Sequence, residues 1–316
     1  MADAVSNELA AALAEVLSAH VVTDVVRLSG GASRDTFRFV ADGRPLILQR
    51  QRSGDVRDMG IEASVVRAAG AAGAPVAQLV AASSAVSALG SAFMILTAVE
   101  GETIARKILR DEQFAHARHV LPVQLGAALA QVHAVDTDDL TALSTTDQVS
   151  QYREALDLLG QPHPTFELVF KWLEANRPAA RRPVLVHGDF RLGNVIVGGE
   201  GLRAVLDWEL AHLGDPMEDL GWLCVKAWRF GSPLPVAGVG DYEQLFDAYE
   251  AAGGGAVDPD VVRWWEVLGT LKWGIMCIGQ ANTHLIGAAR SHELAAIGRR
   301  VCENEYDLFL ALEGRW

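Results

Sequence analysis

The sequence predicts an α+β protein with two lobes, a small β-rich N-terminal lobe and a larger, mostly helical C-terminal lobe. Short strand-like segments separated by Gly and Asp turns are concentrated before residue 100, whereas helical periodicity dominates after Gly101. A compact strand–loop–strand block, Val184–Asp207, interrupts the helices. We therefore expect lobes over residues 1–100 and 101–316, with the boundary near Val99–Glu102.

The N-terminal lobe is expected to begin with a helix over Asn7–Ala19, where Leu and Val recur at helical spacing. Three strands follow, at Val21–Leu28, Thr36–Val40 and Leu46–Gln49. A short Asp-Gly turn joins the last two and predicts a hairpin. A second helix is expected over Asp58–Ala69.

The stretch Ala68–Val99 contains no charged residue and is long enough to cross a bilayer. It is rich in Ala, Ser and Gly, and it contains Pro75. We interpret it as two buried strands, Val76–Ala81 and Phe93–Val99, around a turn at Ser83–Ser91. We therefore expect no membrane partner.

The overall charge argues against a nucleic-acid partner. The net charge is −13, whereas a sequence-independent nucleic-acid binder needs a surface rich in Lys and Arg. Three cysteines without close spacing fit a reducing compartment and give no zinc motif. The N-terminus also lacks the positive region of a signal peptide, so we expect a cytoplasmic protein.

In the C-terminal lobe, helices are expected over Val123–His133, over Thr165–Glu174 and from Pro216 onward. The block between them contains the run His187-Gly188-Asp189 with Asn194 five residues after the Asp, and Asp207 after a further strand. In this order of strands and loops, Asp189, Asn194 and Asp207 lie at the ends of adjacent loops, so we expect their side chains to face one cavity.

Asp189, Asn194 and Asp207 match what phosphoryl transfer from ATP requires. One carboxylate positions the attacking hydroxyl and accepts its proton, while an amide oxygen and a second carboxylate hold Mg²⁺ against the phosphates. Such hard oxygen ligands suit Mg²⁺ rather than softer metals.

This pattern resembles the aminoglycoside phosphotransferase and choline kinase-like superfamily, which has a protein-kinase-like two-lobed fold. The run Leu206–Leu220 is most similar to the branch that includes the kinase-like domains found beside acyl-CoA dehydrogenases. The resemblance implies that Asp189 is the catalytic Asp and that Asn194 and Asp207 are metal ligands. It also implies ATP and Mg²⁺ as cofactors and a small-molecule hydroxyl compound as substrate.

The segment Ser29-Gly30-Gly31-Ala32-Ser33 lies between two predicted strands. Glycine lacks a side chain that would obstruct a phosphate, so the backbone N–H groups here can approach one closely. We expect Gly30, Gly31 and Ser33 to contact the nucleotide.

The third strand should carry a cation for the α- and β-phosphates, paired with an acid on the following helix. Glu62 is the candidate acid. Side chains alternate along a strand, so either Gln49 or Arg50 faces the phosphates. We favour Arg50, brought round by a bulge or a one-residue shift, although Gln49 leaves a weakened or inactive kinase open.

The segment Phe93–Gly101 resembles the hinge between kinase lobes, where backbone groups near Thr97 and Val99 would bond adenine. His133 and His187 are interpreted as structural, and His187 as a brace of the catalytic loop.

Arg191 could contact phosphate or substrate, or pair with a nearby acid. Asp215 and Asp219 are expected to cap and anchor the helix that begins near Pro216.

We therefore predict an ATP-dependent kinase that phosphorylates a hydroxyl of a small metabolite or an aminoglycoside-like compound. The alternative is a nucleotide-binding pseudokinase with a regulatory role, which Gln49 motivates. A monomer or a homodimer is expected.

Overall fold

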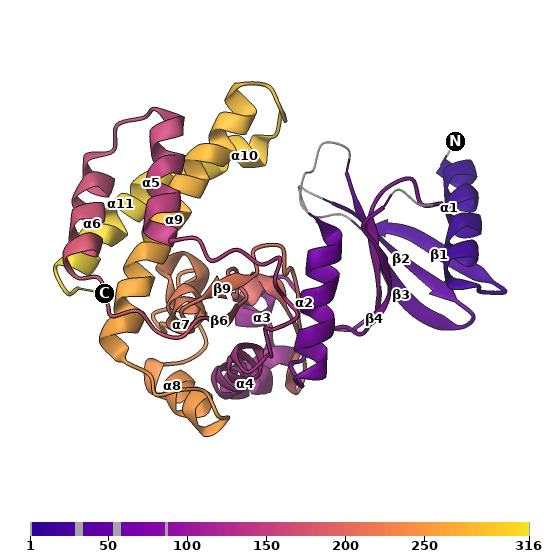
Figure 1. Ribbon diagram of the computed structural model, residues 1–316, viewed down its shortest axis with the longest axis horizontal. Coiled ribbons are helices and arrows are strands. Elements are labelled where there is room, and N and C mark those ends of the chain that lie inside the picture. The colour runs from indigo at the N-terminus through magenta and orange to yellow at the C-terminus, as the bar shows by residue number, and fades with distance from the viewer. Residues whose placement is uncertain (1, 29–33, 53–57, 86–87, 316) are drawn as a thin grey trace.

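The computed structural model describes residues 2–28, 34–52, 58–85 and 88–315. A strand-rich N-terminal part stands beside a helical C-terminal part, with α2 (Met59–Ala71) between them (Figure 1). Gly30, Gly31 and Ser33, predicted to contact phosphates, lie outside the described residues. Within the described residues, no helix combines the length and the apolar character needed to cross a bilayer.

Five antiparallel strands form the N-terminal sheet, in the order β1-β2-β3-β5-β4. Their bounds are Val22–Leu28 for β1, Arg34–Ala41 for β2, Arg44–Gln51 for β3, Leu79–Ser83 for β4 and Phe93–Thr97 for β5. Asp42 and Gly43 connect β2 to β3 with φ of 47° and 78°. Two successive left-handed residues form the hairpin turn that matches strand twist.

The two faces of this sheet pack against different helices. Phe39, Leu48 and Ile95 face α1 (Ala2–Leu17) and share a core with its Leu13. The alternate residues, such as Met94, belong to the core that includes α2. Because side chains alternate along a strand, this division fixes which residues of β2 and β3 can face α2.

The C-terminal part consists mainly of helices. Their bounds are Ala105–Arg110 for α3, Ala115–His133 for α4, Gln148–Leu159 for α5, Pro164–Ala175 for α6, Met217–Cys224 for α7, Tyr242–Ala251 for α8, Pro259–Leu285 for α9, His292–Ile297 for α10 and Val301–Leu312 for α11. Helix α4 begins eight residues before the predicted Val123 and contains Pro122. Buried Ala117 and Leu121 extend its core-facing side, so packing maintains the helix despite the proline.

Two short ribbons interrupt the helices. Strand β6 (Val184–Val186) pairs with β9 (His212–Gly214), and β7 (Val195–Gly198) pairs with β8 (Gly201–Val205). Strand β9 was not predicted, because its three residues are too few to show a periodic pattern.

The segment after β5 is fastened to the second ribbon. Glu102 and Val197 exchange backbone hydrogen bonds of 2.9 and 3.0 Å. A Cβ at Gly101 would lie 2.5 Å from Ile196 Cγ2, so this close approach requires glycine. Backbone pairing thus connects the N-terminal sheet to the strands that carry the candidate site.

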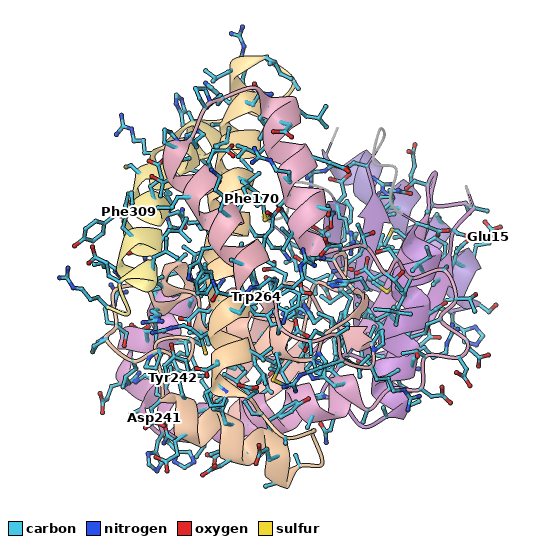
Figure 2. The ribbon with its side chains drawn as sticks, turned by 60° about the vertical axis from the view of Figure 1, so that its left-hand side comes forward. Glu15, Phe170, Asp241, Tyr242, Trp264 and Phe309 are labelled. Carbon is cyan, nitrogen blue, oxygen red and sulfur yellow. The ribbon has the colours of Figure 1, made fainter. Side chains whose placement is uncertain are left out.

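Helix α9 is the centre of the helical part, and Figure 2 shows it running the length of this region with Trp264 labelled. The Trp264 indole donates to the Leu173 carbonyl of α6 at 3.0 Å. Helix α7 crosses α9 where Gly221 lies, and a Cβ there would come within 2.9 Å of the backbone at Val262 and Glu266. The crossing therefore depends on a residue without a side chain.

Replacing Gly221 tests this crossing. Gly221→Ala should lower the free energy of unfolding by about 2 kcal/mol, because the added methyl meets backbone atoms that cannot move away. Gly279→Ala is the control, since nothing lies within 4 Å of its would-be Cβ on α9. That change should be neutral or raise stability by up to about 1 kcal/mol. Equal effects of both variants in urea unfolding would contradict the packing argument.

Candidate active site

The loop that carries Asp189, predicted to be catalytic and called the catalytic loop below, lies between β6 and β7. Gly188 precedes it with φ of 79°, and a Cβ at Gly188 would be 2.5 Å from the Leu210 carbonyl oxygen. The Asn194 amide donates to the backbone oxygen of Asp189 at 3.0 Å and to its Oδ2 at 2.6 Å. Because its nitrogen is used in this way, Asn194 has Oδ1 left for a cation.

The other carboxylate oxygen of Asp189 also receives hydrogen bonds. Arg191 Nε donates to Oδ1 at 3.0 Å, and Trp222 Nε1 of α7 donates to the same atom at 2.8 Å. Arg191 therefore pairs with a nearby acid, Asp189, which is one of the two alternatives that the sequence left open for it. Donors on both oxygens fix the orientation of the carboxylate.

Asp207 follows β8 in a left-handed conformation with φ of 64°. The backbone N–H of the preceding Leu206 donates to the Asn194 carbonyl at 2.8 Å. The Leu206 carbonyl accepts a bond of 2.9 Å from His187 Nε2. These bonds join the two predicted metal-binding loops directly.

The carboxyl of Asp207 lies in an acidic and largely buried environment. Burial, followed by the charge of Glu209, raises its pKa to about 6, while Arg34 acts in the opposite direction. Asp189 also raises it, so the charges of the two loops act on each other. A bound cation would relieve this accumulation of negative charge.

His187 acts as a brace, as its sequence position suggested. Burial lowers its pKa, so the ring is neutral. Its Nδ1 accepts the Asp189 backbone N–H at 3.2 Å while Nε2–H donates to Leu206. One neutral tautomer satisfies both contacts.

Asp219 differs from the prediction. Asp215 caps α7 through the Met217 N–H at 2.9 Å, but Asp219 points into the catalytic loop. It accepts the backbone N–H groups of His187 at 2.8 Å and Gly188 at 2.9 Å, and His133 Nε2 lies 3.2 Å away. Its place in the first turn of α7 suggested a helix anchor, whereas the fold turns it toward β6.

Lys272 of α9 supports the same loop and was not recognised in the sequence. Its Nζ donates to the Gly188 carbonyl at 3.2 Å and lies 3.6 Å from Glu218. It also lies 4.7 Å from the centre of a Trp222 ring. A lysine on a long apolar helix, more than eighty residues from the loop, carries no sequence signal for this role.

On the N-terminal side, the predicted pairing of Arg50 with Glu62 is wrong. The ladder of β3 with β2 and β5 is regular along its length, without a bulge. Arg50 therefore faces the α1 side, where it bonds the Leu89 carbonyl at 3.3 Å and lies over Phe37. Glu62 pairs instead with Arg34 of β2, through Nη1 at 2.7 Å and through Nη2.

Gln49 faces α2, on the same side as this pair. Its Oε1 accepts a hydrogen bond from Arg34 Nη1 at 3.3 Å. At the end of β5, the Thr97 N–H donates to the Gln78 carbonyl at 2.9 Å, so only its carbonyl could meet adenine. In the described part of the chain, the backbone of Val99 makes no hydrogen bond.

Most of the chain matches a known protein family. The sequence profile of the phosphotransferase enzyme family matches residues 24–265. The chain belongs to this family. The match includes both ribbons and the loop that carries Asp189, so the predicted phosphotransferase class is confirmed.

The curated relatives of this chain are longer proteins. The chain is 27% identical over 320 residues to acyl-CoA dehydrogenase family member 11 of Gallus gallus, and the match covers 90% of the chain and 40% of the relative. It is 27% identical over 230 residues to family member 10 of Mus musculus, covering 67% and 21%. The chain thus spans less than half of each relative, and the resemblance to this branch is confirmed.

Solved structures show the same fold. A Ralstonia eutropha protein assigned provisionally to the aminoglycoside phosphotransferases matches with a TM-score of 0.75 at 21% identity, covering 97% of this chain and 98% of that one. Spectinomycin phosphotransferase APH(9)-Ia, in complex with ADP and spectinomycin, gives 0.68 at 13% identity, covering 96% and 98%. Macrolide 2'-phosphotransferase MphH of Brachybacterium faecium gives 0.60 at 20%, covering 93% and 97%. The protein-kinase-like fold is confirmed.

The two predicted metal ligands, Asn194 and Asp207, fit Mg²⁺. Across the described ranges, no group of three carboxylate, imidazole or thiol side chains forms a closed cage for a metal. Asn194 and Asp207 offer one amide oxygen and one carboxylate. Mg²⁺ commonly uses one or two carboxylates and completes its shell with water and substrate phosphates. The partial donor set therefore suits a metal that arrives with a nucleotide.

Asp219→Asn tests the brace of the catalytic loop. An amide cannot accept all three hydrogen bonds without directing its own N–H at a donor. We expect a loss of about 3 kcal/mol in unfolding free energy at pH 7, with Asp139→Asn, an exposed carboxyl, as the neutral control.

The same variant predicts a pH dependence. Burial alone would raise the pKa of Asp219, but bonds from His133 and the His187 N–H hold it below its ordinary value. Its contribution is therefore complete above about pH 4 and disappears as the pH falls further. The difference in Tm between the wild type and Asp219→Asn should be largest above about pH 4 and shrink as the pH falls toward 3. A constant difference would contradict this assignment.

Proposed function

We propose that the protein transfers the γ-phosphate of ATP, with Mg²⁺, to a hydroxyl group of a small molecule. The observation that carries this proposal is the direct hydrogen bonding of the Asp189 and Asn194 loop to the segment that ends in Asp207. Fixed oxygen groups at one place are what phosphoryl transfer requires from a protein.

In this proposal Asp189 positions the acceptor hydroxyl and takes its proton. Arg191 and Trp222 hold the Asp189 carboxylate in one orientation, so little reorganisation is needed when the substrate binds. Asn194 Oδ1 and the Asp207 carboxylate would hold Mg²⁺. The metal would supply charge neutralisation at the phosphates.

The nucleotide is assigned to the N-terminal side. Glu62 would orient a cation toward the phosphates, and the backbone of Val99, with the Thr97 carbonyl, would meet the base. Gly30, Gly31 and Ser33 remain a predicted phosphate loop. Complexes of similar phosphotransferases contain ADP, AMP-PNP or GDP, so both adenine and guanine nucleotides are worth testing.

The surroundings of Asp189 bear on the class of acceptor. Trp222 and Trp228 pack with ring centres 5.2 Å apart, and Arg191 lies 4.9 Å from a Trp228 ring centre. A polycationic aminoglycoside would require carboxylates without a cationic partner close to the transferred hydroxyl, whereas the carboxylate of Asp189 is already paired with Arg191. We therefore propose an uncharged or anionic metabolite as the acceptor.

The proposal is tested by ADP release from MgATP in the presence of a library of hydroxyl compounds. Asp189→Asn should lower acceptor-dependent release about 100-fold or more, because the amide cannot take the proton. Asp139→Asn should leave the rate unchanged. ADP release that Asp189→Asn leaves intact would contradict the role of Asp189. Binding of MgATP without turnover across the library would favour the pseudokinase.

Trp222→Phe tests the orientation of Asp189. It keeps an aromatic ring but removes the N–H donated to Oδ1, so kcat should fall about 10-fold while the KM for MgATP stays constant. Trp273→Phe is matched to it. Trp273 packs in one hydrophobic cluster with Trp222 and Trp228, and its indole nitrogen makes no hydrogen bond with any described residue. Equal kcat values for the two variants would argue that the Trp222 N–H has no role in turnover.

A further inference from the structure

The buried ion pair between Arg34 and Glu62 takes the place expected for a cation on β3. The residues of β3 on the face toward α2 are Pro45, Ile47, Gln49 and Gln51, and none is charged. Arg50 projects from the opposite face. The third strand thus has no cation on the side of Glu62.

We propose that Arg34, on β2, supplies the nucleotide-phosphate cation that β3 lacks. This inference rests on the proposed function, because it assigns a residue to the same nucleotide site. It implies that Gln49 does not mark a degenerate kinase. The positive charge is carried by β2, the strand next to β3, on the same face of the sheet as Gln49.

The strand register explains how β2 can supply this charge. Arg34 pairs with Gln51 and Thr36 pairs with Gln49 across the β2–β3 ladder. Alternation places Arg34 on the same face as Gln49, and their side chains meet at 3.3 Å. A long arginine side chain from the neighbouring strand therefore reaches the space beside the Gln49 side chain.

The guanidinium of Arg34 is fixed but still has donors to offer. Two nitrogens are held by the two Glu62 oxygens, which sets the plane of the fork. Its contacts to Gln49 at 3.3 Å and to Glu209 at 3.5 Å are at the limit of hydrogen bonding. A phosphate oxygen can replace Gln49 or Glu209 as the acceptor of these N–H groups while the pair with Glu62 stays intact.

Arg34 also lies on the side of the candidate metal site. Glu209, its third acidic or amide partner, is two residues after Asp207. A cavity of about 210 Å³ is lined by Arg34, Glu62 and Glu209, so the pair, although buried, borders open space. Electrostatic coupling to Asp207 agrees with this placement.

The function of the pair also accounts for its burial. Only 8% of the Arg34 side chain and 7% of the Glu62 side chain are exposed. Replacing such a pair by apolar residues is often neutral or stabilising, so buried charge by itself is weak evidence of a purely structural role. A role for Arg34 in binding phosphate would explain why the buried Arg34–Glu62 pair is present.

The test compares the binding of MgATP with that of adenosine, which has no phosphate, by calorimetry. Arg34→Gln should weaken MgATP binding about 10-fold or more and leave adenosine binding nearly unchanged. Arg34→Asn combined with Gln49→Arg returns a cation to β3 and should recover most of the MgATP affinity. Arg38→Gln is the matched control, an exposed arginine on the same face of β2, and should change neither affinity.

Each outcome separates this inference from the proposed function. If the wild type binds no MgATP, the proposed function itself fails. If the wild type binds MgATP and Arg34→Gln lowers both affinities equally or neither, Arg34 is only structural and the inference is overturned. Selective loss in Arg50→Gln instead would also overturn it.

A second measurement applies if Arg34→Gln does not fold. In a crystal structure of the wild type with Mg²⁺ and a non-hydrolysable ATP analogue, an Arg34 nitrogen should lie about 3 Å from an α- or β-phosphate oxygen. A bound nucleotide whose phosphates lie beyond about 5 Å from this guanidinium would overturn the assignment.

Discussion

The carboxylate of Asp219 accepts the backbone N–H groups of His187 and Gly188, and the geometry of the site depends on these two bonds. A loop whose backbone donors point inward can keep its conformation only if a buried acceptor satisfies them. A carboxylate does this more strongly than a neutral group. Because the loop is fixed in this way, Asp189 leaves it in a defined direction, with Trp222 and Asn194 already in contact.

The crossing of α7 and α9 carries this support into the helical core. Asp219 and Trp222 lie on α7, and Lys272 on α9, so one interhelical contact positions all three. Gly221 allows the two backbones to approach closely at that point. A change far from the catalytic loop can therefore alter the orientation of Asp189 through rigid helix packing.

Opposing charges are arranged around the site before any ligand binds. Asp207 lies near Glu209 and Asp189. Burial and repulsion between these carboxylates raise its pKa. Arg34 offsets part of that cost from the N-terminal sheet. A cation and phosphates that enter together add charge of both signs to this arrangement, which is the electrostatic condition for binding a metal–nucleotide complex.

The sequence alone determined the loops that carry Asp189, Asn194 and Asp207, because short strands and glycine turns with local spacing place these residues at neighbouring strand ends. It also determined the hairpin of β2 and β3 through its Asp-Gly turn. The partner of Glu62 depends on the folded sheet, since strand register and alternation turn Arg50 to one face and Arg34 to the other. Asp219 and Lys272 were likewise decided by helix packing, because contacts over tens of residues leave no periodic pattern along the chain.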